Sequence, residues 1–382
     1  MANNFSPECL EVLDLLKKKK NVLIAGAPGT GKSRLLGEVA LAFETNPLAV
    51  VPTPGPVHVA GATIPIPKVV PAEVDPALQK VWPAPKRKNR KVFRTAFHQN
   101  SKYREFISGL VPVIGAGGGF KIITGTLYQA SEHGKSADGA ALLVIDEINR
   151  GPAVQVFGGS IVAIEPDKRL NEDNAIRPET QFFQMLDPVT GDNAEYALPE
   201  HLYILAAMNQ ADASVEPLDV AFLRRWAPYR LPFSVEVLRT YFDLGATAGV
   251  PLPAAPTDAK HVYEAAVRAL EAINNRIKLG RGAEFQLGHG IFLTGHPTPE
   301  TDIDAAKASI AEIWGFIQTH VEEVFFGDIR GIAATYNILG SAAVHPFKLS
   351  ETTFADEPRL ELQYPAKVDT SNIYELLFAI AG

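Results

Sequence analysis

The sequence predicts an α/β fold, with a parallel sheet in the region before Pro232 and a mainly helical region after it. The first observation is an apolar stretch, NVLIAG, that leads into a glycine-rich turn and then into helical spacing. The second is a pair of apolar runs, ALLVID and HLYILAAMN, which both end in polar side chains. Buried parallel strands have this pattern, and their carboxyl ends meet ligands. The third is the helical spacing of later stretches such as VYEAAVRALEAINNRI.

Composition indicates a globular protein with a large core. The chain has 382 residues, of which 46% are hydrophobic and 21% charged, and this length allows two or three domains. The net charge of −7 is not typical of a dedicated nucleic-acid clamp. Cys9 is the single cysteine, which excludes an internal disulfide and a cysteine-cluster metal site. There is no secretory signal pattern and no apolar run of about 18 residues, so we expect a cytoplasmic protein without a membrane segment.

The segments before the core strands have distinct patterns. Residues 1–20 have the pattern of an amphipathic helix that ends in four lysines, and residues 21–43 that of a strand, a turn and a helix. Residues 47–85 hold ten prolines, which exclude a long helix or a central strand. We therefore predict a surface insertion over residues 47–91, closed by the basic run KRKNRK. Both basic runs are candidates for nucleic-acid contacts, but solvated basic turns are favoured.

The following stretches alternate between strand and helix patterns. VFRTAFHQN has β character, and SKYREFISGL has helical spacing. Residues 111–124, which include a glycine-rich tip, and residues 181–198 are each predicted to form a β-hairpin. These hairpins are our candidates for pore or partner contacts. The pattern as a whole places the core over residues 21–232 and a helical C-terminal region over residues 233–382.

A phosphate-binding motif lies between the first predicted strand and its helix. GAPGTGKS fits the pattern G-x-x-x-x-G-K-[ST], and a preceding strand and a following helix are the context that this motif requires. The glycines allow backbone N–H groups to curl around a β-phosphate, and the helix N-terminus adds partial positive charge. We expect Lys32 to reach the β- and γ-phosphate oxygens and the Ser33 hydroxyl to bind Mg²⁺. The predicted phosphate-binding residues are Gly26, Ala27, Pro28, Gly29, Thr30, Gly31, Lys32 and Ser33.

Further polar side chains are candidates for catalysis. Asp146, at the end of ALLVID, is predicted to hold the water shell of Mg²⁺, and Glu147 to polarise the attacking water. Asn209, at the end of HLYILAAMN, either orients this water or simply ends the strand in a turn. Arg224 and Arg225 are either surface salt-bridge partners or supply an arginine finger to a neighbouring subunit. Together with the phosphate-binding motif, these side chains predict nucleoside triphosphate hydrolysis.

The order of these motifs resembles the AAA+ ATPases, and within them the McrB family, the nucleotide-driven motor subunits of modification-dependent restriction systems. The resemblance implies an AAA+ P-loop core with β-hairpin insertions and a C-terminal α-helical lid. Gln210 and Ala213 replace a Thr and an Arg of the family's sensor pattern, whereas Asn209 and Asp212 are kept. The matching stretches are GAPGTGKS, FHQNSKYREFISG, IDEINRG, IEPDKR, MNQAD and LDVAFLRRW.

The resemblance also implies a function. The chain would hydrolyse ATP or GTP with Mg²⁺ in a homo-oligomeric, hexameric ring and drive a McrC-like nuclease subunit of an anti-phage restriction system, with DNA contacted through partners. The stretch DEINR is shared with MoxR-type ATPases, so an ATPase that remodels a protein partner is the alternative. An inactive nucleotide sensor is disfavoured because the Lys, Ser, acidic and Asn side chains are all present. His289 and Arg150 are each left with two interpretations, a nucleotide or subunit contact, or ordinary packing and pairing.

Overall fold

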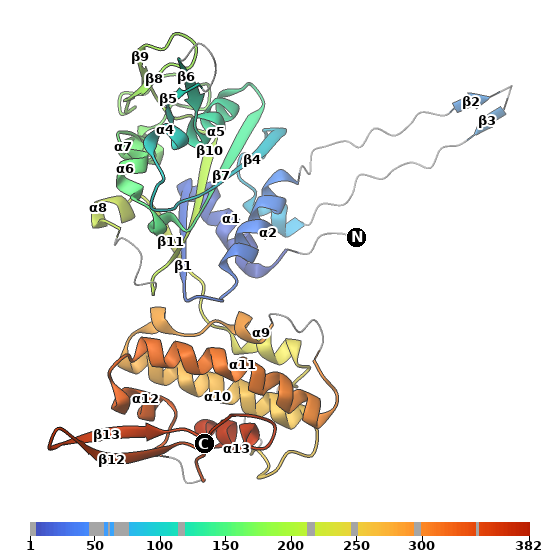
Figure 1. Ribbon diagram of the computed structural model, residues 1–382. Coiled ribbons are helices and arrows are strands. Elements are labelled where there is room, and N and C mark those ends of the chain that lie inside the picture. Colours follow the sequence, from blue (N-terminus) through green and yellow to red (C-terminus); the bar gives the residue numbers. More distant parts are fainter. Residues whose placement is uncertain are drawn as a thin grey trace. The chain divides into compact units, whose positions relative to one another are not determined.

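The chain forms two compact units in a computed structural model (Figure 1). The first unit contains residues 1–25, 32–208 and 212–230, and the second contains residues 26–31, 209–211 and 231–382. The structure describes residues 5–45, 57–59, 62–64, 76–113, 119–211, 218–245, 251–293, 299–340 and 344–382.

A five-stranded sheet forms the centre of the first unit, in the order β11-β1-β10-β7-β4. Its pairs β1 with β11, β10 with β7 and β4 with β7 are all parallel. The three inner strands are buried almost throughout because they are apolar over their whole length, whereas the edge strands alternate in exposure. The predicted α/β fold is therefore confirmed. The strands are β1 (Asn21–Gly26), β4 (Asn89–Ala96), β7 (Gly139–Asp146), β10 (Leu202–Asn209) and β11 (Ala227–Arg230).

Helices α1 (Pro7–Lys19) and α2 (Lys32–Glu44) pack together at the start of the first unit. The Ser6 side chain caps α1 by accepting from the N–H of Cys9, and Pro7 occupies the first turn, where it loses no helical hydrogen bond. The Ser6 hydroxyl also donates to Glu38 of α2 at 2.8 Å. The lysines at the end of α1 lie where the helix dipole favours positive charge.

The described residues 76–91 pack into the first unit. Helix α3 (Pro76–Val81) is followed by Trp82, which is buried and donates from Nε1 to the carbonyl oxygen of Ala42 at 3.0 Å. The guanidinium of Arg90 lies over the rings of Trp82 and Phe43, at 3.6 and 4.2 Å from the ring centres. Arg90 is the second residue of β4, whose pairing with β7 begins at Asn89, so this end of the predicted insertion belongs to the packed sheet and its cover.

Most of the proline-rich stretch lies outside the described residues. Of residues 47–75, the structure describes only the backbone of β2 (Val57–Val59) and β3 (Ala62–Ile64), which pair as an antiparallel hairpin. The predicted surface insertion over residues 47–91 therefore stays a prediction for this part.

The basic runs make contacts within the first unit. Lys17 donates to the carbonyl oxygen of Lys80 at 2.6 Å, and Lys20 pairs with Glu200 at 2.8 Å. Arg87, in the second run, donates to carbonyl oxygens of the 136–137 turn and of Glu172. Both basic runs therefore contribute contacts within the first unit.

Both hairpins form as the pattern predicts. β5 (Ser108–Pro112) pairs with β6 (Phe120–Thr124), and β8 (Phe183–Leu186) pairs with β9 (Asn193–Tyr196), both antiparallel. They lie together at one end of the first unit in Figure 1, where the Ser108 hydroxyl accepts from the N–H of Leu186 at 3.1 Å. The glycine-rich tip around residues 114–118 lies outside the described residues. Between the hairpins and the sheet, α5 (Thr126–Lys135) packs on β7.

Smaller helices complete the first unit. SKYREFISGL gives only the single helical turn α4, because β5 already begins at Ser108. An added Cβ at Gly109 would lie 2.2 Å from Cβ of Arg104, so the chain folds back tightly here. The short elements are α4 (Tyr103–Phe106), η1 (Ile148–Arg150), α6 (Ala153–Phe157), α7 (Ser160–Ala163), η2 (Pro166–Lys168) and α8 (Val220–Leu223).

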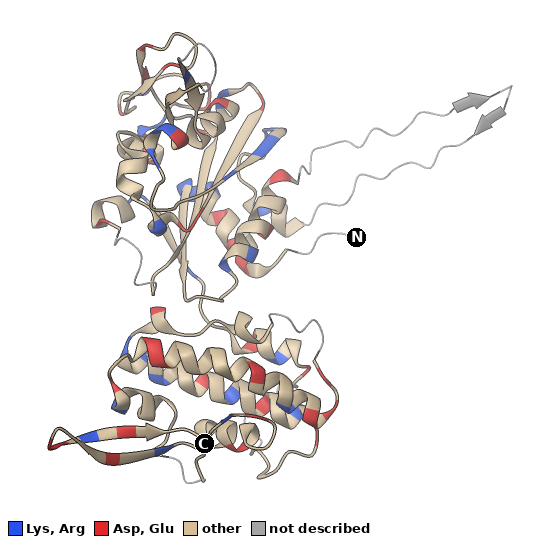
Figure 2. Cartoon of the chain, viewed as in Figure 1, with Lys and Arg blue, Asp and Glu red and all other residues tan. Residues whose placement is uncertain are grey.

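The second unit is mainly helical, as predicted. Two long helices carry its core, which includes Val262, Leu270 and Trp314. In Figure 2, positively and negatively charged residues are interspersed along these helices. None of the helices in the described residues is both long and apolar enough to cross a membrane. The helices are α9 (Val235–Tyr241), α10 (Ala259–Gly280), η3 (Ala283–Phe285), η4 (His289–Phe292), α11 (Ile303–Val324), α12 (Ile329–Thr335) and α13 (Ile373–Ala381).

A hairpin interrupts the helical C-terminal region. β12 (Lys348–Phe354) and β13 (Glu357–Gln363) pair over their full length and are largely exposed. The turn residues Ala355 and Asp356 both have positive φ, which suits a tight hairpin turn. The sequence pattern did not predict these strands.

Candidate nucleotide-binding site

The glycine-rich loop joins β1 to α2. Gly29 and Gly31 have φ values of +77° and +89°, in the left-handed region that favours glycine. At Gly26 an added Cβ would lie 2.5 Å from the carbonyl oxygen of Leu231, so a larger residue does not fit. Inside the loop, the hydroxyl of Thr30 donates to the carbonyl oxygen of Ala27 at 2.9 Å. Gly29 and Gly31 are therefore needed for backbone conformation, and Gly26 for the space beside Leu231.

Lys32 and Ser33 begin α2 in the first unit. Lys32 is only 8% exposed. Burial lowers the pKa of its ammonium group, while the charges of Glu147 and Asp146 raise it. The two carboxylates thus offset part of the cost of burying this ammonium group.

Asp146 and Glu147 follow the buried part of β7. The Ser33 hydroxyl donates to Oδ2 of Asp146 at 3.4 Å, and the backbone N–H of Glu147 donates to Oδ1 at 3.0 Å. Hydroxyl and carboxylate oxygens are ligands that Mg²⁺ accepts, so this pair fits the ion. Glu147 itself has a left-handed backbone, with φ 51° and ψ 46°, which is strained for a non-glycine residue and found at functional sites. Arg150 forms an ion pair with its carboxylate at 3.3 Å.

Asn209 ends β10, which is the neighbour of β7 in the sheet. The strand is buried as far as Met208, and Ala206 pairs with Ile145, so the two strands end at nearby levels. Asn209 belongs to the second unit, and Asp212 lies outside the described residues. The predicted role of Asn209 in orienting water therefore stays a prediction.

Arg224 and Arg225 have different surroundings in the structure. The Arg225 side chain is 7% exposed, and its Nε lies 2.8 Å from Oε1 of Glu165. Its guanidinium also donates to the carbonyl oxygen of Ala221. Arg224 is exposed, and within the described ranges its side chain makes no hydrogen bond or ion pair. It lines an open cavity of about 750 Å³ together with Lys18 and other residues of the first unit.

A buried arginine, Arg169, is connected by hydrogen bonds to the segment that carries Arg224 and Arg225. Arg169 is completely buried and donates to the carbonyl oxygens of Ile164 and Leu202 and to Oδ1 of Asn21. The Asn21 amide in turn donates to the carbonyl oxygens of Ile164, at 2.8 Å, and Arg225, at 3.1 Å. Desolvation lowers the pKa of Arg169 to about 10. These hydrogen bonds link the start of β1 to the segment of Arg224 and Arg225. In the sequence, only the family stretch IEPDKR, which ends at Arg169, pointed to this residue.

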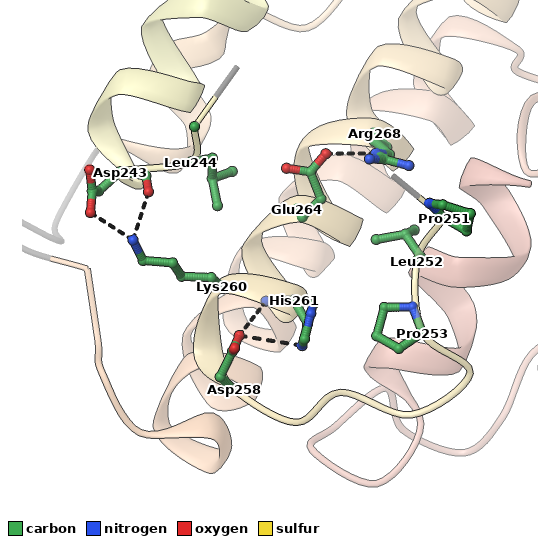
Figure 3. A pocket seen from close by; sticks show the side chains of 11 residues that line it. Asp243, Leu244, Pro251, Leu252, Pro253, Asp258, Lys260, His261, Glu264 and Arg268 are labelled. Atoms are coloured by element: carbon green, nitrogen blue, oxygen red, sulfur yellow. Dashed lines mark hydrogen bonds and ion pairs between the residues drawn. The ribbon is translucent and has the colours of Figure 1, made fainter. Parts of the chain in front are cut away.

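A second cavity lies in the helical unit, with a volume of about 360 Å³ (Figure 3). Its charged side chains pair with one another. Nζ of Lys260 lies 2.7 Å from Oδ2 of Asp243, and Nε of Arg268 lies 2.6 Å from Oε1 of Glu264. None of the predicted site residues lines it.

Comparison with known proteins agrees with this fold. A family model described as an AAA domain of the dynein-related subfamily matches residues 83–226. The chain is 27% identical over 330 residues to the type IV methyl-directed restriction enzyme EcoKMcrB subunit of Escherichia coli K12, covering 83% of this chain and 56% of that protein. It is 29% identical over 211 residues to the type II restriction enzyme BsuMI component YdiS of Bacillus subtilis 168, covering 54% of this chain and 56% of that protein.

Solved structures are more distant. NtrX from Brucella abortus is 13% identical with a TM-score of 0.33, covering 89% of this chain and 66% of NtrX. PCH-2 of C. elegans is 12% identical with a TM-score of 0.29, covering 72% of this chain and 62% of PCH-2.

These findings confirm the predicted resemblance. Residues 83–226 match an AAA domain, and the chain resembles the AAA+ ATPases. Within that class it resembles McrB, because it is similar to the two restriction-enzyme components named above. The chain spans 56% of the length of each of these two relatives.

Proposed function

We propose that this chain binds a nucleoside triphosphate with Mg²⁺ and hydrolyses it in a ring of identical subunits, which drives a McrC-like nuclease in an anti-phage restriction system. The observation that carries the proposal is the cluster in the first unit, where buried Lys32 lies close to the Asp146 and Glu147 carboxylates and Ser33 contacts Asp146. The proposed substrate is ATP or GTP. The expected location is the cytoplasm.

We assign each side chain of the site a role. Lys32 neutralises charge on the β- and γ-phosphate oxygens, and Ser33 and Asp146 hold Mg²⁺ directly or through its water. The ion supplies further positive charge to the phosphate oxygens. Glu147 polarises the attacking water, with Arg150 as its ion-pair partner. Asn209 orients the same water.

Arg224 is our candidate for the arginine finger. An arginine finger must extend from its own subunit to the neighbour's γ-phosphate, so its side chain cannot be committed elsewhere. Arg224 is exposed, whereas Arg225 is held by Glu165. The finger explains why the active form would be a ring, because each subunit completes the site of the next. Six subunits, as in the resemblance, are our expectation.

The partner is proposed from the relatives, which are both components of restriction enzymes. Conformational change at the subunit interfaces would transmit hydrolysis to a nuclease bound to the ring. The hairpins β5–β6 and β8–β9 are our candidates for the partner contact, and DNA would be reached through partners.

The experiment is to co-express the chain with the proteins of its neighbouring genes, isolate the complex, and measure nucleotide hydrolysis and DNA cleavage. We expect hydrolysis by the chain alone, and cleavage only with a nuclease partner and a hydrolysable nucleotide. The Glu147→Gln variant serves as the matched control in the same complex. A complex with a cofactor-bearing enzyme or a von Willebrand-type protein, without any nuclease, would instead favour the MoxR-like alternative.

A further inference from the structure

A short segment of the helical unit contacts the phosphate loop, and both belong to the same compact unit. The backbone N–H of Gly288 donates to the carbonyl oxygen of Pro28 at 2.9 Å, and that of Gly290 donates to the carbonyl oxygen of Gly29 at 2.8 Å. Two successive carbonyl groups of the loop are thus bound by two alternate N–H groups of the segment.

The contact is too close for side chains at the two glycines. A Cβ added to Gly288 would lie 2.0 Å from the carbonyl carbon of Gly29, and one added to Gly290 would lie 2.7 Å from its oxygen. Neither Gly288 nor Gly290 has a positive φ. These positions therefore need glycine for space and not for backbone conformation.

The hydrogen bonds fix how the loop presents its own N–H groups. In a planar trans peptide the C=O and the following N–H point in opposite directions. Holding the carbonyls of Pro28 and Gly29 toward the segment therefore turns the N–H groups of Gly29 and Thr30 away from it, and the Thr30 N–H donates to the carbonyl oxygen of Ala27 at 3.4 Å. Phosphate binding by such a loop depends on this orientation, because the N–H groups are the donors.

The segment is itself anchored. Asn274 of α10, which is 1% exposed, donates to the carbonyl oxygen of Leu287 at 2.9 Å and accepts from its N–H at 2.7 Å. Nδ1 of the buried His289 accepts from the N–H of Ser234 at 3.3 Å, which places the proton of the neutral ring on Nε2. That Nε2 lies 3.9 Å from the position of a Cβ on Gly31.

We propose that residues 287–290, which we name the loop clamp, are positioning residues that hold the phosphate loop in its binding conformation. The ligand affected is the phosphate chain of the nucleotide, so the inference rests on the proposed function. The clamp ties nucleotide affinity to the helical unit: a change that withdraws Gly288 and Gly290 releases the two loop carbonyls and weakens phosphate binding.

The test compares Gly290→Ala with Gly315→Ala in the full chain. Both add one methyl group in the same unit, but an added Cβ at Gly315 meets nothing within 4 Å. We would measure the dissociation constants of fluorescent ATP and GTP analogues, the melting temperature without nucleotide, and hydrogen exchange of the amides of residues 286–292. We expect Gly290→Ala to weaken binding at least about tenfold, as loss of loop hydrogen bonds would, and to lose amide protection. Gly315→Ala should match the wild type in binding and exchange.

A second variant covers the case in which Gly290→Ala does not fold. Asn274→Ser removes the anchor of the clamp without touching the loop, and we expect the same loss of affinity and protection. Wild-type affinity in a folded Gly290→Ala or Asn274→Ser protein, beside weak binding by Lys32→Ala, would overturn the clamp. Wild-type affinity in Lys32→Ala as well would instead overturn the proposed phosphate site.

Discussion

Replacing Arg224 and Arg225 one at a time by Ala should have opposite effects on stability and turnover. The residues are adjacent and carry the same charge, but Arg225 is buried against Glu165, whereas Arg224 is exposed. If the exposed residue is the finger, Arg224→Ala should abolish hydrolysis and leave the fold intact. Arg225→Ala should first of all destabilise the first unit.

The structure sets the size of the stability difference. Removing one partner of a fully buried ion pair costs about 3–5 kcal/mol. The Glu165 side chain keeps 26% of its exposure, so water can still solvate the carboxylate that is left, and we expect about 2 kcal/mol for Arg225→Ala. That corresponds to a fall of about 4–8 °C in melting temperature for a unit of this size. Arg224→Ala loses no described partner and should stay within about 0.5 kcal/mol of the wild type.

The assay has two parts. Calorimetry without nucleotide measures the melting temperatures, and turnover is measured over a range of protein concentrations. An arginine finger accelerates hydrolysis by about 10³-fold or more, so Arg224→Ala should retain almost no turnover. Mixing it with Lys32→Ala protein should restore part of the activity, because each variant supplies the group that the other lacks. Normal turnover in Arg224→Ala, or no recovery on mixing, would contradict the assignment of Arg224 as the finger.

Four further changes test other parts of the site and fold. Lys32→Ala should weaken binding of a fluorescent ATP or GTP analogue by about 10- to 100-fold, since it removes a buried charge-assisted contact; unchanged affinity contradicts the phosphate site. Glu147→Gln should bind nucleotide, turn over at least about a hundredfold more slowly and accumulate assembled rings in sizing experiments; wild-type turnover would exclude its role. Arg169→Met leaves buried oxygens without a donor and should cost about 3 kcal/mol in urea unfolding. Burial, with the charges of Arg87 and Lys20, lowers the pKa of His201 to about 4 from 6.5. The unfolded chain therefore binds the extra proton first, so stability should fall as the pH drops from about 6.5 to 4, and His201→Gln should flatten this fall in pH-dependent melting.

Local sequence was sufficient to predict the phosphate loop and the strands around it. The motif GAPGTGKS and its flanking strand and helix are local, and Gly29 and Gly31 are needed for the backbone conformation of the loop itself. The ends of β7 and β10 were predictable for a similar reason, because continuous apolar runs mark buried parallel strands and the first polar residue marks where they end. Hence the apolar runs alone point to Asp146 and Asn209 as the polar residues at the strand ends.

Tertiary contacts determine the surroundings of the arginines, which the local sequence does not predict. The difference between Arg224 and Arg225 comes from Glu165, which is far away in the sequence, and no pattern around two adjacent arginines reveals it. The same holds for Arg169, whose partners come from β1, β10 and the turn after α7.

The glycines of the loop clamp and the packed residues before β4 show the same limit. In the sequence, Gly290 resembles an ordinary turn glycine, and only the structure shows that Gly29 packs against it. Trp82 lies among prolines, which suggested an exposed stretch, but it is buried and hydrogen-bonded. Burial and hydrogen bonding depend on which segments the fold brings together, whereas local patterns report only on the backbone and its nearest neighbours. The sequence could therefore identify the groups that carry the chemistry, and the fold decided which groups hold them in place.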